Sequence, residues 1–477
     1  MKRAFIICFL LFPFLLFADE VRVEALEFWQ NASEWPDELR VDQLVQSSLV
    51  ASGIEEDLLP SYSERLNSIL EEYRRDFLPL QSGLNERELG EAILHWMHET
   101  LLTGRYITDQ TRIDVLLDRG DYNCVSSAVI YLILTRAAGL ETAGEETTDH
   151  AFCTLALPGE SVDIETTTLL GFDPGTKKEF SQSFSGQTGF AYVEPGDYRR
   201  RKPASDKKMI SLILQNRIAL YQRRGQYGEA VGPAVDRWFF LPNETNRNDM
   251  NDAFRNRVSL LNGRGRYTEA IDFLLPLSEE LGLIEENRDL IGVLVLNQLI
   301  SLLNQNLTDE GEAYLAEWGS WLSPDQIKEQ KKVINERRAQ TAVDRESYPE
   351  ALATIRTMKG EGTLSVARSD ELITWLHQNR AIEILNGGGA NREESHLEVI
   401  DFFDSLPAEE RDLRGITDHR ARYLNNWAVL IHNRFADLVN GQKYDEAEAL
   451  LNEALERGGT IKMLLDDRAL LQRIRSR

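Results

Sequence analysis

A motif that recurs along the second half of the chain constrains its fold more than any other feature. The sequence Gly-Gln-Tyr-Gly-Glu-Ala at 225–230 returns as Gly-Arg-Tyr-Thr-Glu-Ala at 265–270, and partial matches occur at 348–351 and 441–447. In a pair of antiparallel helices the glycine would end the first helix, the tyrosine would pack in the turn, and the alanine would let the second helix approach closely. One such pair cannot bury its apolar face alone, so the pattern predicts a stack of helix pairs.

The surrounding sequence extends this helical pattern from about residue 206 to the end of the chain. An Asn-Arg pair followed by apolar residues precedes each full motif, and a related start occurs at 297–302. The repeats resemble tetratricopeptide repeats, with a period somewhat longer than is usual for that family. We therefore expect residues 206–477 to form an all-α helical-repeat solenoid, with an irregular helical bundle as the alternative. The resemblance implies a protein or peptide partner and leaves the oligomeric state open.

The first 18 residues have the composition of a signal peptide. Lys2 and Arg3 form a positive start, residues 4–17 are almost entirely apolar, and Ala18 stands at a candidate cleavage site. This predicts export to the periplasm or cell envelope, with an uncleaved anchor as the alternative. The apolar run is too short for a comfortable membrane span, and no later stretch reaches that length. We therefore expect no membrane span in the mature chain.

The bulk composition is that of an acidic globular protein. The formal net charge is −25, and a chain this acidic repels phosphate backbones, so nucleic acid is not expected as a partner. The length of 477 residues indicates two or three domains. The expected parts are a signal peptide (1–18), an N-terminal helical segment (19–84), a mixed domain (85–205) and the helical repeats (206–477).

The mixed domain is expected to have an α+β fold, in which a buried helix packs against an antiparallel sheet. Residues 125–140 are apolar for most of their length, and Gly139 stands where a helix would stop. A helix that is apolar on all sides lies in the interior. Strand-like segments follow at 150–157 and 161–167, on either side of a Pro-Gly turn.

Cys124 stands at the predicted start of this buried helix, after a loop that contains Gly120. The free backbone amides and the helix dipole at that end stabilise an anion. A thiolate should therefore form there more readily than in solution, and the thiolate is the nucleophilic form of cysteine. Cys124 is the candidate nucleophile.

His150, at the start of the next strand-like segment, is the candidate general base, because His95 and His98 precede the cysteine and the next histidine is His377. Strand residues alternate between faces, so His150 and Phe152 share one face and Cys153 points to the other. If His150 faces Cys124, then Cys153 points away, which argues against a disulfide between the two cysteines. A disulfide that merely staples the fold is the structural alternative.

An acidic group commonly orients the histidine of such a pair, and two candidates stand on the second strand. Asp163 and Glu165 lie on the same face, so alternation does not separate them. A four-residue connection at 156–159 would place Glu165 directly across from His150, whereas aspartate is the more usual chemical type. Both residues stay open as the acid.

These elements resemble the transglutaminase-like superfamily, which shares its core with papain-type cysteine proteases. The resemblance covers residues 85–175 and rests on Gly120 with Cys124, the His-Ala-Phe sequence at 150–152, and an acidic residue before a Thr-Thr pair. It implies that Cys124 attacks a carbonyl carbon while His150 moves the proton, in an amide hydrolase, protease or acyltransferase without metal or other cofactor. An inactive scaffold whose repeats assemble envelope proteins is the alternative. The oxyanion donor is not identified.

Overall fold

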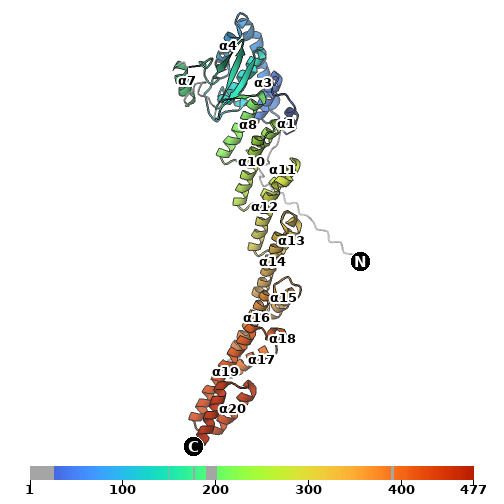
Figure 1. Ribbon diagram of the computed structural model, residues 1–477, viewed down its shortest axis with the longest axis vertical. Helices are drawn as coiled ribbons and strands as arrows, with labels where there is room; N and C mark the ends of the chain where they lie inside the picture. Colours follow the sequence, from blue (N-terminus) through green and yellow to red (C-terminus); the bar gives the residue numbers. More distant parts are fainter. Residues whose placement is uncertain (1–25, 149, 176–177, 190–200, 388–391, 477) are drawn as a thin grey trace, which may run out of the picture. The chain divides into compact units, whose positions relative to one another are not determined.

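The computed structural model divides the chain into two compact units, Met1–Gly282 and Leu283–Arg477, called here the N-terminal and C-terminal units (Figure 1). The residues that the structure describes are 26–148, 150–175, 178–189, 201–387 and 392–476. The expected signal peptide at 1–18 lies outside them. Within these ranges, no helix has both the length and the apolar character needed to cross a membrane.

Helix α6 (Cys124–Ala137) is the centre of the N-terminal unit, as the sequence predicts. Every residue from Val125 to Thr135 is buried, and the helix packs against strands β1 and β2 and helices α2, α4 and α8. The side chain of Asn123 caps its first turn by accepting hydrogen bonds from the amides of Val125 and Ser126. The helix ends just before Gly139, whose φ of 80° reverses the chain.

A four-stranded antiparallel sheet covers one side of α6. Its strands are β1 (Thr142–Glu146), β2 (Ala151–Leu157), β3 (Glu160–Ile164) and β4 (Lys202–Ala204), in the order β3-β2-β1-β4. The sequence predicted β2 and β3 but neither of the other two strands. The short β4 and the Glu- and Gly-containing β1 lack the apolar alternation that marks a strand.

The hairpin between β2 and β3 is tighter than the four-residue connection we considered. Leu157 pairs with Glu160, so the connection is only Pro158-Gly159, and Cys153 pairs with Ile164. Continuing this register places Glu165 across from Phe152 instead of His150. The shift is two residues, and a shift of two leaves every side chain on its original face. Glu165 and His150 therefore still share a face.

The N-terminal helices belong to the same core as α6. Buried residues from three of them, Trp29, Leu44 and Leu66, join the hydrophobic cluster that also holds α6 and the sheet. The segment expected at 19–84 is therefore packed into the sheet-bearing unit. These elements are α1 (Leu26–Ser33), α2 (Val41–Ala51), α3 (Leu59–Glu72), a π-helical turn (Tyr73–Phe77), a 3₁₀ turn (Leu78–Gln81), α4 (Glu86–Thr100) and α5 (Ile113–Arg119).

The first helices of the repeat region also belong to the N-terminal unit. Met209 and Ile213 of α8 are fully buried in the hydrophobic core that contains α6. Helix α8 contacts α2, α6, β1 and β4. The sequence boundary at 205/206 thus falls between β4 and a helix that packs on the sheet. The remaining helices of this unit are α7 (Lys178–Thr188), α8 (Asp206–Arg223), α9 (Val231–Phe240), α10 (Glu244–Gly263) and α11 (Tyr267–Glu280).

The C-terminal unit is a repeat-like succession of helices, most of which pack against the next helix in the chain. The motif alanines are fully buried at Ala351 and Ala447, as expected for close helix approach. Of the motif tyrosines, Tyr227 lies in the turn between α8 and α9, as predicted, whereas Tyr348 and Tyr444 are the first residues of their helices. The helices are α12 (Ile284–Asn304), α13 (Thr308–Trp318), α14 (Pro324–Arg345), α15 (Tyr348–Gly360), α16 (Val366–Gly387), α17 (Arg392–Asp404), α18 (Ala408–Arg411), α19 (Arg414–Asn440), α20 (Tyr444–Gly458) and α21 (Lys462–Arg475), with a 3₁₀ turn at Gly319–Trp321.

Candidate active site

Cys124 is the first residue of α6 and is partly exposed. The turn that carries it is fixed on both sides. Asn123 caps the helix with its side-chain oxygen and donates from its amide nitrogen to the carbonyl of Thr108, at 3.1 Å. The hydroxyl of Ser126 accepts from the backbone amide of Asn123, at 2.9 Å. The sulfur therefore lies at the N-terminus of a buried helix, beside its first free backbone amides.

His150 immediately precedes β2, and its ring is held in one orientation by three neighbours. Its Nε2 lies 2.6 Å from Oε2 of Glu165, and the two side chains are 14% and 4% exposed. The ring is nearly parallel to Phe152, with centroids 6.2 Å apart, and meets the edge of Phe184 of α7 at 5.7 Å. Because a carboxylate only accepts, Nε2 carries the proton of this bond, which leaves Nδ1 for a second partner.

The side chain of Cys124 also interacts with this ring. Burial opposes the charged imidazolium, but the Glu165 carboxylate and the Cys124 side chain together raise the pKa of His150 well above its ordinary value. No hydrogen bond of regular geometry joins the ring to the sulfur, although the two side chains are close enough to interact. Catalytic hydrogen bonds in unliganded enzymes are often long and tighten only with substrate.

The two acidic candidates have different partners. Glu165 reaches His150, whereas both carboxylate oxygens of Asp163 accept from the guanidinium of Arg201, at 2.7 and 2.9 Å. Arg201 also lies over the ring of Phe152 at 5.0 Å. The structure therefore brings Cys124, His150 and Glu165 together and places Asp163 in a separate ion pair.

Glu165 is held in place by the segment that follows it. The hydroxyl of Thr167 donates to Oε1 of Glu165 at 2.9 Å, and the backbone amide of Glu165 donates to the carbonyl of Gly171 at 2.8 Å. A β-carbon at Gly171 would lie 1.9 Å from the carbonyl oxygen of Glu165, so only glycine fits there. Glu165 is 3% exposed. Its Oε1, which does not contact His150, therefore accepts a hydrogen bond from a hydroxyl and not from water.

Three further side chains hold the segment that follows Glu165. His98 of α4 donates from Nε2 to the carbonyl of Thr166 at 3.1 Å, and Tyr122 donates to the carbonyl of Thr167 at 3.0 Å. The hydroxyls of Ser127 and Thr166 lie 2.8 Å apart. Burial lowers the pKa of His98 to about 4, so this imidazole is neutral at pH 7 and serves as a hydrogen-bond donor.

Tyr106 is a site residue that the sequence did not reveal. Burial raises the pKa of its phenol, and the charge of Cys124 raises it further, so the hydroxyl stays protonated beside the sulfur. Its position depends on the pairing of its backbone with Tyr122, where Ile107 N donates to Tyr122 O at 2.8 Å. A protonated phenol there could donate to a developing oxyanion. A lone tyrosine in a loop carries no sequence signal for such a contact.

Cys124 and Cys153 are both free thiols, so the disulfide alternative is wrong. Cys153 faces α6, but at a different place from Cys124. Its thiol donates to the carbonyl of Ala128, one turn along the helix from Cys124, at 3.6 Å. Cys153 is fully buried, and burial raises its pKa well above that of an ordinary thiol. It is therefore an inert packing residue.

The assembled groups are a thiol at a helix N-terminus, an imidazole held by a carboxylate, and a protonated phenol. These are the parts required for acyl transfer through a cysteine nucleophile. No protein-family model, curated protein or solved structure matches the chain.

Proposed function

We propose that the N-terminal unit is a cysteine-dependent amide hydrolase, protease or acyltransferase with a transglutaminase-like arrangement. The observation that carries the proposal is the 2.6 Å pair between His150 and Glu165 beside Cys124 at the start of α6. The order of the parts along the chain supports it, since the cysteine opens the central helix, the histidine precedes β2 and the acid follows β3.

In this mechanism the thiolate of Cys124 attacks the carbonyl carbon of an amide and forms a C–S bond. The carbonyl π electrons move to oxygen, where the hydroxyl of Tyr106 and the backbone amide of Cys124 are the candidate donors to the oxyanion. Collapse of this intermediate breaks the C–N bond, and the imidazolium of His150 gives its proton to the leaving amine. Attack of water on the thioester then completes hydrolysis, whereas attack of an amine forms a new amide and releases the thiol.

Glu165 has a positioning part in this scheme. Its carboxylate holds Nε2–H of His150, which aims Nδ1 at the sulfur and stabilises the imidazolium that forms. We also propose that the helical repeats bind a protein or peptide, and that the chain acts in the periplasm or envelope. The composition of residues 1–18 and the repeat motif support these two parts of the proposal.

Thiol alkylation over a range of pH tests the catalytic pair, with Cys153 as a control within the same molecule. We expect iodoacetamide to label Cys124 well below pH 8.5, the pKa of an ordinary thiol, and to leave Cys153 unlabelled. His150→Ala should move the labelling of Cys124 towards ordinary thiol pH. Slow labelling of Cys124 that is insensitive to His150→Ala would favour an inactive scaffold.

A further inference from the structure

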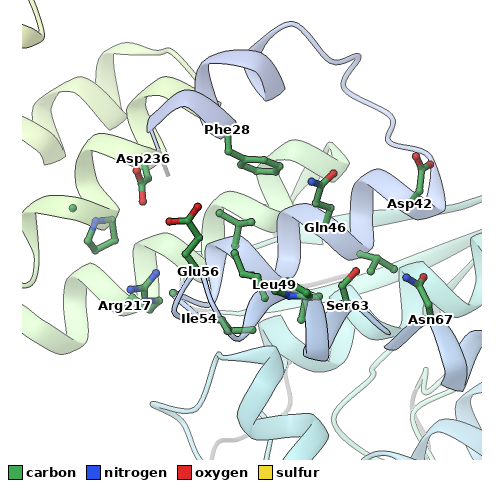
Figure 2. Close-up of a pocket in the computed structure, with 17 residues that line it drawn as sticks. Phe28, Asp42, Gln46, Leu49, Ile54, Glu56, Ser63, Asn67, Arg217 and Asp236 are labelled. Carbon is green, nitrogen blue, oxygen red and sulfur yellow. The ribbon is translucent and has the colours of Figure 1, made fainter. Parts of the chain in front are cut away.

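A separate cavity of about 660 Å³ lies among α1, α2, α3, α8 and α9 of the N-terminal unit. Its lining contains none of the residues of the Cys124 site. Figure 2 shows Arg217, Glu56 and Asp236 at one end, apolar side chains such as Leu49 in the middle, and Asp42 and Asn67 towards the other end. The volume is in the range of pockets that hold small molecules or short peptides.

Arg217 is the cationic group at one end of this cavity, and its hydrogen-bonding capacity is largely unused. Nη1 donates to the carbonyl of Ala51 at 2.8 Å, but Nε is buried and has no hydrogen-bond partner. No carboxylate among the described residues pairs with this guanidinium, although the chain carries a net charge of −25. A buried donor without a partner is costly, and a guanidinium binds carboxylates with high geometric specificity.

The backbone beside Arg217 is shaped to admit the guanidinium. Gly53, in the connection between α2 and α3, has a φ of 70°, and a β-carbon there would lie 2.1 Å from Nη2 of Arg217. Any other residue at this position would displace the guanidinium and would also strain the backbone. The glycine thus keeps Arg217 at the end of the cavity.

The other residues that line the cavity favour a peptide over other ligands that carry a carboxylate. Leu49 and Ile54 are apolar and nearly buried, which suits an apolar side chain. Gln46, Ser63 and Asn67 also line the cavity, and none of their side chains hydrogen-bonds to another described residue. A fatty acyl chain would desolvate these polar groups without replacing their hydrogen bonds to water, whereas peptide amides would pair with them.

We propose that this cavity binds the C-terminal end of a peptide whose last residue is apolar. The terminal carboxylate pairs with Arg217, the last side chain lies against Leu49 and Ile54, and the preceding amides face the polar side chains of α2 and α3. Glu56 is an exposed carboxylate at the same end and repels the ligand carboxylate, while Asp42 is neutralised by its ion pair with Arg40. The site is distinct from the proposed catalytic function.

Fluorescence polarisation with a labelled hexapeptide ending in leucine tests this proposal on the full-length protein. The peptide with a free carboxylate should bind about tenfold more tightly than its C-terminal amide, as expected for one charge-assisted pair. Arg217→Gln should abolish this difference. Arg223→Gln is the matched control, because this exposed arginine of α8 pairs with Asp109 and does not line the cavity.

Two further variants keep the test decisive. Glu56→Gln removes an exposed charge, and it should strengthen binding of the free carboxylate about two- to threefold. Weaker binding in this variant would show that the peptide amine is recognised, and would overturn the proposal. Cys124→Ala should leave binding unchanged, since the peptide does not occupy the catalytic site.

Three results would reject this assignment of the cavity. The first is equal affinity for the acid and the amide. The second is a free-acid preference that survives Arg217→Gln in a folded protein. The third is displacement of the labelled peptide by dodecanoate at concentrations where the unlabelled free-acid peptide does not displace it, which would identify the ligand as a fatty acid.

Discussion

At the scale of single residues, the protonation of His150 depends on two opposing effects. Burial lowers the pKa of the imidazole, and the neighbouring Glu165 carboxylate and Cys124 side chain raise it well above its ordinary value. Glu165→Gln removes the carboxylate charge and leaves the burial. We therefore expect the pKa of His150 to fall in this variant, and the labelling of Cys124 by iodoacetamide to slow at neutral pH. An NMR titration of the His150 ring measures the first effect directly.

The His150–Glu165 pair also makes the free energy of unfolding depend on pH. Because the folded pKa of His150 is raised above about 6.5, the value of an unperturbed histidine, its contribution to stability is fully present below that pH. The contribution is lost as pH rises through the raised folded pKa. Asp163→Asn is the control, since Asp163 pairs with Arg201. If this variant shifted the His150 titration as much as Glu165→Gln, the assignment of Glu165 would be wrong.

Tyr106→Phe removes the proposed oxyanion donor and leaves the ring. We expect the rate of thioester formation with p-nitrophenyl acetate to fall by about 100- to 1,000-fold, the range for loss of one such donor. Alkylation of Cys124 by iodoacetamide creates no oxyanion, so its rate should change far less. A parallel loss in both reactions would show instead that Tyr106 supports the thiolate.

The sequence predicted the candidate site residues that are marked by a local pattern. Cys124 was identifiable because it opens an apolar helix, and His150 because it is the first histidine after Cys124 and the next is His377. The choice between Asp163 and Glu165 was not predictable, because residues two positions apart on a strand lie on the same face. It is decided by contacts with Arg201 and Thr167, which are set by tertiary packing. Tyr106 was missed for the same reason.

At the scale of secondary-structure elements, the cap of α6 links local folding to the thiol. Asn123→Ala removes the side-chain acceptor of two backbone amides and should cost about 0.5–2 kcal/mol of unfolding free energy. Because the fraying turn carries Cys124, the preference for labelling Cys124 at low pH should also diminish. Urea unfolding and iodoacetamide labelling measure the two effects separately.

Asn85→Ala provides a matched control for this prediction. Asn85 is likewise the N-cap of its helix, α4, and its side chain accepts from one backbone amide, that of Glu88, at 3.0 Å. Its loss should cost a similar unfolding free energy and leave the labelling of Cys124 unchanged. Equal effects on labelling in both variants would mean that overall stability, and not the first turn of α6, governs the reactivity of the thiol.

The elements themselves were predictable to the extent that their sequence carries a regular apolar period. The apolar run of α6 and the β2–β3 hairpin were predicted, whereas the short strands β1 and β4 were not. Gly144 of β1 shows why, since a β-carbon there would lie 2.3 Å from Met209 of α8. The residue is selected by a contact with a helix 65 positions along the chain, and no local pattern reports such a contact.

At the scale of the whole molecule, the sequence pattern and the packing place the first boundary differently. The helical period begins near residue 206, but α8 buries Met209, Ile210 and Ile213 in the core that contains α6. The compact N-terminal unit extends to Gly282. The period of the apolar residues shows which face of a helix is apolar. The boundary of a unit depends instead on which neighbouring element covers that face.

Two truncations distinguish these boundaries. A chain that ends at residue 282 keeps every contact of the Cys124 site and of its core, so it should be soluble, unfold cooperatively in urea and label at Cys124 like the full chain. A chain that ends at residue 205 exposes the face of α6 that α8 covers. Each buried aliphatic side chain that is removed costs about 1.5–3 kcal/mol of unfolding free energy, and the loss of several exceeds the total stability of most domains. The shorter chain should therefore be unfolded or aggregated, and cooperative unfolding in it would place the domain boundary at residue 205.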